Sequence, residues 1–549
     1  MLPTVRHPPA RAPAEAPAVP LPQARAQGIA ALVEALRDPA CYPHPVDRVD
    51  VLETHISYVL LAGEYAYKLK KRVRLPFLDF STPQLRRRYC REELRLNRRT
   101  APQVYLDVVP IGGTLRAPRV DLGGRVLEHA VRMRRFPQEA LYSRLAARGA
   151  LRDEHVDALA EAMASFHGSI AGGAVPDGIG TAGAILAPAM ENFDEILALR
   201  PGGPARDALE ALRAWTGAEG AALAPTFDAR RLAGFVRECH GDPHLGNVVS
   251  IDGAAVLFDG IEFAPRLRWT DVMADAAFPF MDLARGVERL AWRFLDRYLQ
   301  RTGDYEGLAV LRFYAVYRAV VRAKIAAVRA SQLAHDDPRL LDALSDLDEY
   351  AQLARRLSWR PAPVLVLMHG VSGSGKSIAA QVLLESLGAV RLRSDVERKR
   401  LHGLDPAAKT DSAVGGGIYT AEAGERTYRR LEALARAALS AGYPVVVDAA
   451  FLERPRRDGL WDVARACNAA FQVVSCCAPA AVLRERVGRR SRDLADASEA
   501  GPEVLERQLA MEHGLAPGEL VHATRIDTSS PLWRIAIESL ARRFHSRRD

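Results

Sequence analysis

The sequence has few cysteines and no long hydrophobic run. Its six cysteines are scattered without a C-x-x-C pair, which excludes a disulfide framework or a cysteine-based zinc site and is typical of reduced, mostly buried thiols in the cytosol. No apolar stretch approaches the roughly 18 residues that are needed to span a bilayer. The first twenty residues lack the continuous apolar stretch of a secretory signal. We therefore expect a cytoplasmic protein that has no membrane-spanning helix.

Aromatic residues and lysines are also scarce. Aromatics make up only 7% of the chain and are not interleaved with a basic stripe, so nucleic-acid binding by base stacking is possible but not favoured. The net charge of +8 permits phosphorylated ligands without demanding them. Only seven of the 75 basic residues are lysines. Because lysine is a compact point charge and arginine a planar fork, each lysine is a candidate for a specific role.

The length and the order of sequence patterns divide the chain into two folded parts. A chain of 549 residues is too long for a single hydrophobic core. Residues 1–22 hold seven prolines and little to bury, so we predict a disordered tail. The helical pattern stops at 358–363, where we place a linker between a first domain, 23–357, and a second domain, 364–549.

The first domain has the pattern of an α+β fold and the second that of an α/β fold. In the first, a β-rich lobe precedes a stretch from about 139 to 357 that is mainly helical and is interrupted by a turn-rich segment at 238–270. The second alternates strands and helices, which predicts a parallel sheet flanked by helices, with only helices after the strand FQVVSCC. In the β-rich lobe we expect a helix at about 25–37, a turn at 62–64 between two strands, a helix at 85–99, and strands at 105–111 and 127–136.

A phosphate-binding loop opens the second domain. The string GVSGSGKS at 370–377 fits G-x-x-x-x-G-K-[ST], follows an apolar strand and precedes a helix. Glycines let the backbone wrap closely around phosphate, and the N–H groups and the helix N-terminus hold the anion. We expect Lys376 to reach the β- and γ-phosphates of ATP and Ser377 to ligate Mg²⁺. The other nucleotide-binding residues are then Gly370, Ser372, Gly373, Ser374 and Gly375.

Two carboxylates end predicted strands of the same domain. Asp448 closes YPVVVD and would hold the metal through water, the alternative being a helix N-cap. Asp395 closes GAVRLRSD, and Arg398 follows one helical turn later. The carboxylate could accept a hydroxyl proton while the arginine holds an anionic substrate, and an N-cap beside a surface arginine is the alternative.

An arginine-rich run, LRERVGRRSR at 483–492, begins on a predicted helix. We interpret it as a lid whose arginines, Arg486 and Arg489 among them, cover the transferring phosphoryl group. The alternative is a solvated, charged helix face.

The loop, the SDxxR string at Ser394–Arg398, the DAAF string at Asp448 and the arginine-rich run resemble the small P-loop kinases of the gluconate kinase, zeta-toxin and polynucleotide kinase group. The resemblance covers about 362–540. It implies an α/β P-loop NTPase fold with a parallel sheet, and it implies that Asp395 is the base on the substrate side.

The turn-rich segment of the first domain holds a second candidate site, in the string CHGDPHLGNVVSIDGAAVLFDGIEF at 239–263. Its two histidines lack a third soft ligand at suitable spacing, so they do not predict a metal site of their own. Asp242 and Asn247 are five residues apart, the spacing of Asp and Asn in the kinase catalytic loop. Asp259 ends the strand AAVLFD, as the metal-binding Asp of kinases does.

Upstream, YAYKLKK places Lys68 on a predicted strand, and Glu92 and Glu93 lie on the next helix. A lysine–glutamate pair would orient the α- and β-phosphates of ATP. We expect Lys68 to pair with either glutamate, and a basic hairpin edge that resists aggregation is the alternative.

These residues resemble the aminoglycoside phosphotransferase and choline kinase type of protein-kinase-like fold across about 45–340. The resemblance implies that Asp242 is the catalytic base and that Asn247 and Asp259 ligate Mg²⁺. The string DGIEF leaves Asp259, Glu262 or both as the metal ligand, and no GxGxxG loop precedes Lys68. The whole arrangement resembles bacterial bifunctional proteins that join an aminoglycoside phosphotransferase domain to an ATP-binding P-loop domain.

Together these observations predict an enzyme that transfers the γ-phosphoryl group of ATP, with Mg²⁺, to a hydroxyl group of a small molecule at two sites. One alternative is a polynucleotide 5′-hydroxyl kinase activity in the P-loop half. The other is that one half binds ATP only as a regulatory module.

Overall fold

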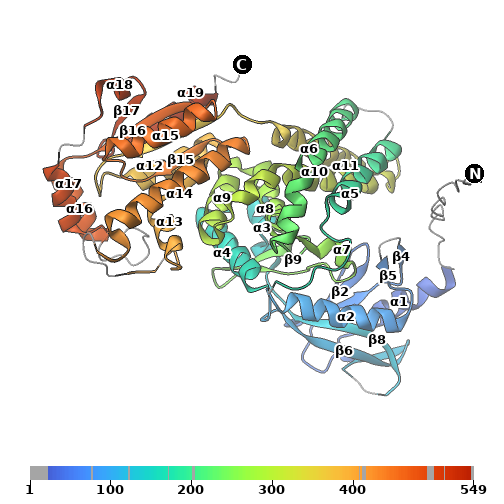
Figure 1. Ribbon diagram of the computed structural model, residues 1–549. Helices are drawn as coiled ribbons and strands as arrows, with labels where there is room; N and C mark the ends of the chain where they lie inside the picture. The colour runs from blue at the N-terminus through green and yellow to red at the C-terminus, as the bar shows by residue number, and fades with distance from the viewer. Residues whose placement is uncertain are drawn as a thin grey trace, which may run out of the picture. The chain divides into compact units, whose positions relative to one another are not determined.

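A computed structural model describes residues 23–75, 78–121, 124–170, 172–200, 205–406, 408–410, 416–490, 500–511 and 514–545. The tail predicted at 1–22 lies outside these residues. The chain forms two compact units (Figure 1). Unit 1 is Met1–Phe136 with Asp259–Pro265, and unit 2 is Pro137–Phe258 with Arg266–Asp549.

Unit 1 is built on an antiparallel six-stranded sheet in the order β1-β2-β3-β8-β6-β7. The β-rich lobe predicted from the sequence is confirmed. Helix α1 (Gln23–Ala35) packs Leu32 and Val33 into the core of this sheet. Helix α2 (Pro83–Asn97) begins at the N-cap Thr82, whose side chain accepts the N–H of Leu85. The strands are β1 (Val49–Glu53), β2 (Ser57–Ala62), β3 (Tyr65–Lys70), β6 (Tyr105–Thr114), β7 (Ala117–Val120) and β8 (Val126–Arg134), with a separate small pair, β4 (Arg74–Leu75) and β5 (Leu78–Asp79).

The hairpin of β2 and β3 turns at Gly63, where the sequence predicts it. Gly63 has a φ of +58°, and a Cβ there would lie 2.7 Å from the carbonyl oxygen of Pro45, so only glycine fits. Along β3, Tyr67 and Leu69 enter the hydrophobic core. Because side chains alternate along a strand, Lys68 and Lys70 share the other face.

The first part of unit 2, up to residue 358, is mainly helical, as predicted. Short strands occupy its turn-rich segment, where β10 pairs with β11 and β9 with β12. The helices are α3 (Tyr142–Ala147), α4 (Asp153–Ser169), α5 (Ala182–Leu199), α6 (Arg206–Leu232), α7 (Pro265–Arg268), α8 (Val272–Gly286), α9 (Glu288–Thr302), α10 (Leu308–Ser331) and α11 (Arg339–Ser358). The strands are β9 (Val236–Glu238), β10 (Val248–Ile251), β11 (Ala254–Leu257) and β12 (Trp269–Asp271).

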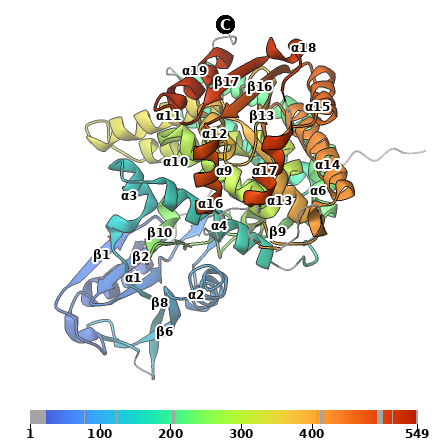
Figure 2. The same ribbon diagram turned by 90° about the vertical axis from the view of Figure 1, so that its left-hand side faces the viewer.

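The second part of unit 2 contains the predicted parallel sheet, with five strands in the order β14-β15-β13-β16-β17. Figure 2 shows helices on both sides of it. Alternate residues of β13 point to opposite faces: Val366 packs with α12 and α19, and Leu367 packs in the core that holds α14 and α15. The strands are β13 (Val364–His369), β14 (Val390–Arg393), β15 (Val445–Asp448), β16 (Ala470–Cys477) and β17 (Ala523–Asp527). The helices are α12 (Lys376–Leu387), α13 (Ser394–Leu401), α14 (Ala421–Ser440), α15 (Arg454–Ala466), α16 (Ala480–Arg490), α17 (Pro502–Ala510), α18 (Pro517–Leu520) and α19 (Trp533–His545).

Strand β17 corrects the expectation that only helices follow the strand FQVVSCC. The strand is at the edge of the sheet and reads ATRID, in which Ile526 alone is buried. A single buried residue gives almost no alternating pattern. The sequence therefore contains little signal for this strand.

Within unit 2, the helical part and the parallel sheet share one hydrophobic core. Phe294 of α9 belongs to the same buried cluster as Leu365 and Leu392 of the sheet. A buried ion pair reinforces this contact, because Arg391 of β14 donates to Asp296 of α9 at 2.7 Å. Residues 359–363 have no regular secondary structure, and the chain on both sides of them belongs to unit 2. The division into domains at this linker remains a prediction.

None of the helices in the described ranges is both long enough and apolar enough to cross a membrane.

The ion pair of Arg391 and Asp296 should contribute strongly to stability. We expect Asp296→Ala to lower the free energy of unfolding by about 3 kcal/mol, because it leaves a guanidinium buried without its counter-charge. Asp458→Ala, which removes an exposed pair with Arg454 at 3.6 Å, should change it by less than about 0.5 kcal/mol. Chemical denaturation of both variants measures the difference, and equal stabilities would contradict the role of this pair.

Candidate active sites

The P-loop lies between β13 and α12, as predicted. Three of its glycines have φ angles that disfavour other residues: +138° at Gly370, +78° at Gly373 and +82° at Gly375. A Cβ at Gly370 would lie 2.4 Å from the carbonyl oxygen of Cys476, so the loop passes close to β16. Helix α12 begins at Lys376. Its first N–H groups and its dipole therefore point toward a position where an anion binds favourably.

Lys376, Ser374 and Ser372 contribute polar groups to the loop. Lys376 Nζ donates to the carbonyl oxygen of Val371 at 2.9 Å. The Oγ atom of Ser374 is buried and has no hydrogen-bond partner in the described part of the chain. The N–H of Ser372 donates to Oε1 of Gln508 at 2.7 Å. A buried hydroxyl without a partner is uncommon in folded proteins and is consistent with a bound polar ligand.

Asp448 ends β15, the neighbour of the P-loop strand. Its Oδ2 atom is buried, lies 3.4 Å from Nε of Arg393, and forms no hydrogen bond with any described residue. The alternative of a helix N-cap is excluded, because the N-cap of the next helix is Glu453. Together with Ser377 at the start of α12, this oxygen fits the oxygen ligands, direct or through water, that Mg²⁺ prefers.

Asp395 lies in the first turn of α13, whereas the sequence placed it at the end of a strand. Strand β14 ends at Arg393, and that residue is also the N-cap of α13. The half-buried carboxylate of Asp395 forms no ion pair with the residues that the structure describes. Arg398, one turn later, lies 5.1 Å from the ring of Tyr419, and its buried Nε has no partner among the described residues. The two side chains remain candidates for the acceptor side of the site.

The two lid arginines have different surroundings. Arg486 donates to the carbonyl oxygen of Gly373 at 3.3 Å and to Oγ1 of Thr528 at 2.7 Å, so it touches the P-loop. Arg489 pairs with Glu485 on the exposed face of α16. Residues 491 and 492 of the predicted lid lie outside the described residues. The structure therefore brings Arg486 to the loop and leaves Arg489 at the surface.

Thr528 is a contact that sequence reasoning missed. Its Oγ1 donates to the carbonyl oxygen of Ser374 at 2.9 Å, and its Oγ1 atom would lie 3.0 Å from a Cβ at Gly375. Thr528 follows the unpredicted strand β17. No motif marks it.

In unit 1, Lys68 lies in a cluster of five charged side chains, four of which are buried. Lys68 Nζ is 2.8 Å from Glu93 Oε1 and also pairs with Asp259. Lys70 is 2.7 Å from Glu93 Oε2 and pairs with Glu262. Glu93 is thus the partner of Lys68, while Glu92 pairs with Arg95 on the helix surface. The predicted lysine–glutamate pair is present, and one glutamate serves two lysines.

The charges of this cluster set its pKa values. Burial would lower the pKa of Lys68, but Asp259 and Glu93 raise it well above its usual value. Burial would raise the pKa of Glu93, but Lys68 and Lys70 outweigh burial and lower it. For Glu262, burial prevails over Lys70 and raises the pKa. Both lysines are therefore charged at neutral pH.

The sequence left Asp259, Glu262 or both as candidate metal ligands, and the two carboxylates differ in exposure. The Glu262 side chain is only 4% exposed and is held by Lys70, whereas the Asp259 side chain is 42% exposed. Asp259 has a φ of +62°, a left-handed conformation that residues other than glycine adopt infrequently. Of the two carboxylates, that of Asp259 is the better placed for a cation.

Two side chains hold the backbone around Asp259, and neither was predicted from the sequence. The N–H of Asp259 donates to the hydroxyl of Tyr105 at 3.1 Å. The N–H of Gly260 donates to Oδ1 of Asn97 at 2.8 Å. Asn97 ends α2, the helix of Glu93, and its Nδ2 donates to the carbonyl oxygen of that residue. Helix α2 therefore positions both the glutamate and the aspartate.

In unit 2, one face of α8 supports the Asp242 loop. Asp275 accepts the N–H of His240 at 3.2 Å and that of Gly241 at 2.8 Å. Asp282, seven residues or about two helical turns later, accepts the N–H of Leu245 at 3.0 Å. Two carboxylates of α8, the buried Asp275 and the half-buried Asp282, thus fix both ends of the loop.

The side chains of the loop have defined roles. His240 Nδ1 accepts the N–H of Asp242 at 3.3 Å, so its Nε2–H donates to the carbonyl oxygen of Phe258 at 2.9 Å. Asn247 Nδ2 donates to the carbonyl oxygen of Asp242 at 3.0 Å, and no described residue donates to its Oδ1, which leaves that oxygen for a cation. His244 Nε2 lies 3.5 Å from Asp242 Oδ2.

The carboxylate of Asp242 is a stronger base than an ordinary aspartate. Burial raises its pKa, and the nearby His244, His240, Arg322 and Arg318 offset this only in part. A raised pKa improves a general base as long as it stays below the working pH.

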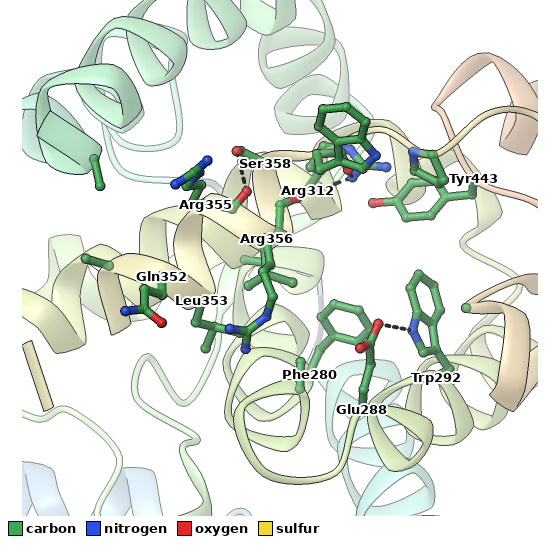
Figure 3. A pocket seen from close by; sticks show the side chains of 18 of the residues that line it. Phe280, Glu288, Trp292, Arg312, Gln352, Leu353, Arg355, Arg356, Ser358 and Tyr443 are labelled. Atoms are coloured by element: carbon green, nitrogen blue, oxygen red, sulfur yellow. Dashed lines mark hydrogen bonds between the residues drawn. The ribbon is translucent and has the colours of Figure 1, made fainter. Parts of the chain in front are cut away.

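A cavity of about 970 Å³ lies elsewhere in unit 2, among α8, α9, α10 and α11 (Figure 3). Figure 3 shows Arg356 extending toward Phe280 and Glu288, and Trp292 Nε1 donates to Glu288 at 3.5 Å. None of the site residues that the sequence predicts lines this cavity.

Lys70 should be essential to the charge balance of unit 1. We expect Lys70→Met to lower the free energy of unfolding by roughly 3 kcal/mol, because it leaves Glu93 and Glu262 buried with a single lysine. Lys71→Met is the matched control, since Lys71 pairs with the exposed Glu53. Thermal unfolding of both variants provides the measurement. An unchanged melting temperature for Lys70→Met would show that the cluster does not stabilise the fold.

Comparisons with known proteins agree with the P-loop. The family described as an AAA domain (AAA_33) matches residues 365–513. The uncharacterized protein Rv2004c of Mycobacterium tuberculosis (strain ATCC 25618 / H37Rv) is 29% identical over 515 residues, which cover 91% of this chain and 99% of that protein. Two solved structures resemble parts of the chain: a gluconokinase from Sinorhizobium meliloti 1021 (TM-score 0.24, 23% identity, 35% of this chain and 100% of that chain) and a choline/ethanolamine kinase family protein from Mesorhizobium loti (TM-score 0.35, 13% identity, 60% and 99%). Residues 365–513 are therefore similar to the AAA domain family, which agrees with the phosphate-binding loop predicted from the sequence.

Proposed function

We propose that this protein is an ATP-dependent phosphotransferase with two nucleotide sites, each acting on a hydroxyl group of a small molecule. The observation that carries the proposal is the P-loop of the AAA-type domain, where Lys376 begins α12 and an unbonded, buried oxygen of Asp448 lies at the end of the adjacent strand. A phosphate-binding loop beside a buried carboxylate is the arrangement that nucleotide phosphates with Mg²⁺ require.

In the P-loop half, each side chain has a proposed part in transfer. Lys376 binds the β- and γ-phosphates, and Ser377 and Asp448 hold Mg²⁺, which neutralises phosphate charge when it is bound. Asp395 accepts the proton of the acceptor hydroxyl while that oxygen bonds to the γ-phosphorus and the bond to ADP breaks. Arg398 orients the acceptor. Of the lid arginines, Arg486 supports the loop, and Arg489 would have to move to reach the phosphoryl group.

In the kinase-like half, the proposed roles follow from the resemblance to kinases and from the contacts found within each unit. Lys68, held by Glu93, binds the α- and β-phosphates, and Asp259 is a metal ligand. In unit 2, Asn247 is the second proposed metal ligand and Asp242 the base for the acceptor hydroxyl. The raised pKa of Asp242, caused by burial, supports its part as a proton acceptor.

Lys376→Ala should disable the P-loop half. We expect ADP release by this half to fall roughly 10²-fold or more, because a charge on the transferring phosphates is lost. The assay uses the full-length chain carrying Asp242→Asn, in which we expect only the P-loop half to release ADP. Lys324→Ala, which removes an exposed pair with Glu195, is the control. Turnover equal to that of the control would contradict the proposed P-loop site.

Asp242→Asn should abolish transfer in the other half while ATP binding survives. The amide cannot accept the hydroxyl proton but keeps the size of the side chain. Asp259→Asn should instead weaken the binding of ATP with Mg²⁺, because a metal ligand is lost. Calorimetric titration with ATP and Mg²⁺ in the Lys376→Ala background separates the two effects. If Asp242→Asn keeps full activity on an identified acceptor, the proposed enzymatic function of this half is wrong.

A further inference from the structure

Two arginines on one face of α10 form no ion pair with a carboxylate of the described residues. Arg318 and Arg322 are four residues apart, so they lie one helical turn from each other on the same side of the helix. Neither forms an ion pair with any residue that the structure describes. Arg329, two turns beyond Arg322, does pair with Asp346, at 2.6 Å.

Arg318 is fixed in position although no described side chain or carbonyl group pairs with its terminal nitrogens. The residue is only 8% exposed. Its Nε donates to the carbonyl oxygen of Ala274 at 3.3 Å, and its guanidinium lies 4.6 Å from the ring centre of Phe278 and 5.4 Å from that of Tyr317. Within the described ranges, nothing accepts a hydrogen bond from its two Nη atoms. Asp242 is close enough for its pKa to be lowered by Arg318, but no described carboxylate forms an ion pair with this guanidinium. A buried guanidinium without a partner at contact distance is costly, and a bound anion would supply that partner.

Arg322 is positioned by a neutral group. Its Nε donates to the hydroxyl of Tyr350 at 3.3 Å, and the tyrosine ring lies 5.5 Å away. The same hydroxyl accepts a hydrogen bond from Arg285 at 3.0 Å. Burial would lower the pKa of Arg322, but Tyr350, Asp282 and Asp242 raise it, and neither carboxylate forms an ion pair with it in the described part of the chain. Arg285, in contrast, has its own carboxylate partners on α11.

Both arginines belong to the surroundings of Asp242. The ring of Phe278, which Arg318 contacts, lies 6.2 Å from the ring of His244. His244 in turn is 3.5 Å from the Asp242 carboxylate. Helices α8 and α10, which carry Phe278 and the arginines, pack against each other (Figure 1). The charges of Arg318 and Arg322 also act on Asp242, since both lower its pKa against the effect of burial.

We infer that the acceptor phosphorylated at Asp242 carries an anionic group, a carboxylate or a phosphate, which the guanidinium groups of Arg318 and Arg322 bind. The inference rests on the proposed role of Asp242 as the base. Guanidinium forks match both groups in geometry and charge. An acceptor with several ammonium groups would instead meet two cations beside the base. The resemblance to aminoglycoside phosphotransferases therefore does not extend to a polycationic substrate.

The first experiment measures turnover with acceptors that differ in charge. The full-length Lys376→Ala chain is assayed for ADP release with glycerol, glycerate and glycerol 3-phosphate, with glucose, gluconate and glucose 6-phosphate, and with kanamycin. Within each series, we expect an anionic acceptor to be phosphorylated in preference to the neutral one. A preference for the carboxylate or for the phosphate compound then identifies which anionic group the arginines bind. Arg322→Met should raise KM for that acceptor roughly 10- to 100-fold, because a hydrogen bond to a charged group is lost. Arg329→Met should leave KM unchanged.

The second experiment tests anion binding without catalysis. Inorganic phosphate and acetate are titrated at constant ionic strength, and the melting temperature is recorded in the same background. We expect one of these anions to raise the melting temperature in a saturable way. This rise should be smaller in Arg322→Met and in Arg318→Lys and unchanged in Arg329→Met. Arg318→Lys keeps the charge and most of the side-chain length, so it guards against loss of folding on replacement of a buried arginine.

The outcomes distinguish failure of the inferred anion site from failure of the proposed phosphotransferase function of this half. Asp242-dependent phosphorylation of a neutral or cationic acceptor, with KM insensitive to both arginines, would overturn the inference and leave the proposed function standing. Equal stabilisation of all variants by both anions would overturn it as well. If no acceptor gives Asp242-dependent ADP release, the proposed function of this half fails, and arginine-dependent anion binding then still supports the anion site alone.

Discussion

A buried carboxylate is stable only where hydrogen-bond donors or cations around it compensate its charge. The candidate sites of this protein depend on carboxylates held in this way. Asp275 lies beneath the Asp242 loop, where hydrogen bonds from His167 and from backbone N–H groups overcome the effect of burial and lower its pKa. Glu93 plays the same part in unit 1, because it holds two lysines through its two oxygens. In both places the supporting carboxylate makes no contact with a reacting group, yet it fixes the backbone or the side chain that would. Removing such a group would leave several donors unpaired at once, so we expect substitutions at these positions to cost more stability than substitutions at the solvent-facing ends of the sites.

The few lysines and many arginines of the chain are used differently. Lys68 and Lys70 share a single glutamate, which is geometrically possible because each ammonium group is compact and approaches one oxygen. Arginines instead span two partners or lie on aromatic rings, as Arg391 does between Asp296 and Gln381. Lys376 of the P-loop also donates to an oxygen at close range, the carbonyl oxygen of Val371 at 2.9 Å. Scarcity alone did not identify function, however, since Lys71 and Lys324 pair with exposed glutamates outside any site.

Sequence reasoning succeeded where the signal was local. The P-loop glycines, the turn at Gly63 and the alternation that puts Lys68 and Lys70 on one face all follow from a few neighbouring residues. It failed where the partner is distant in the chain: Asn97 holds Gly260 and Thr528 holds the P-loop, and neither lies in a recognisable motif. The choice between Asp259 and Glu262 also required the structure, because only packing shows which carboxylate Lys70 has buried. The proposed roles of these residues remain predictions.

The core that joins the helical part of unit 2 to its parallel sheet has a practical consequence. Phe294, Leu365 and Leu392 lie in one apolar cluster, and the chain passes from the first to the others through 359–363. Cutting the chain there would expose matching apolar faces on both fragments. Surfaces of this kind drive self-association, so separately expressed halves should be prone to aggregation. A fragment that begins near 360 would therefore be a poor substitute for the intact protein in biochemical work, whatever its nucleotide affinity.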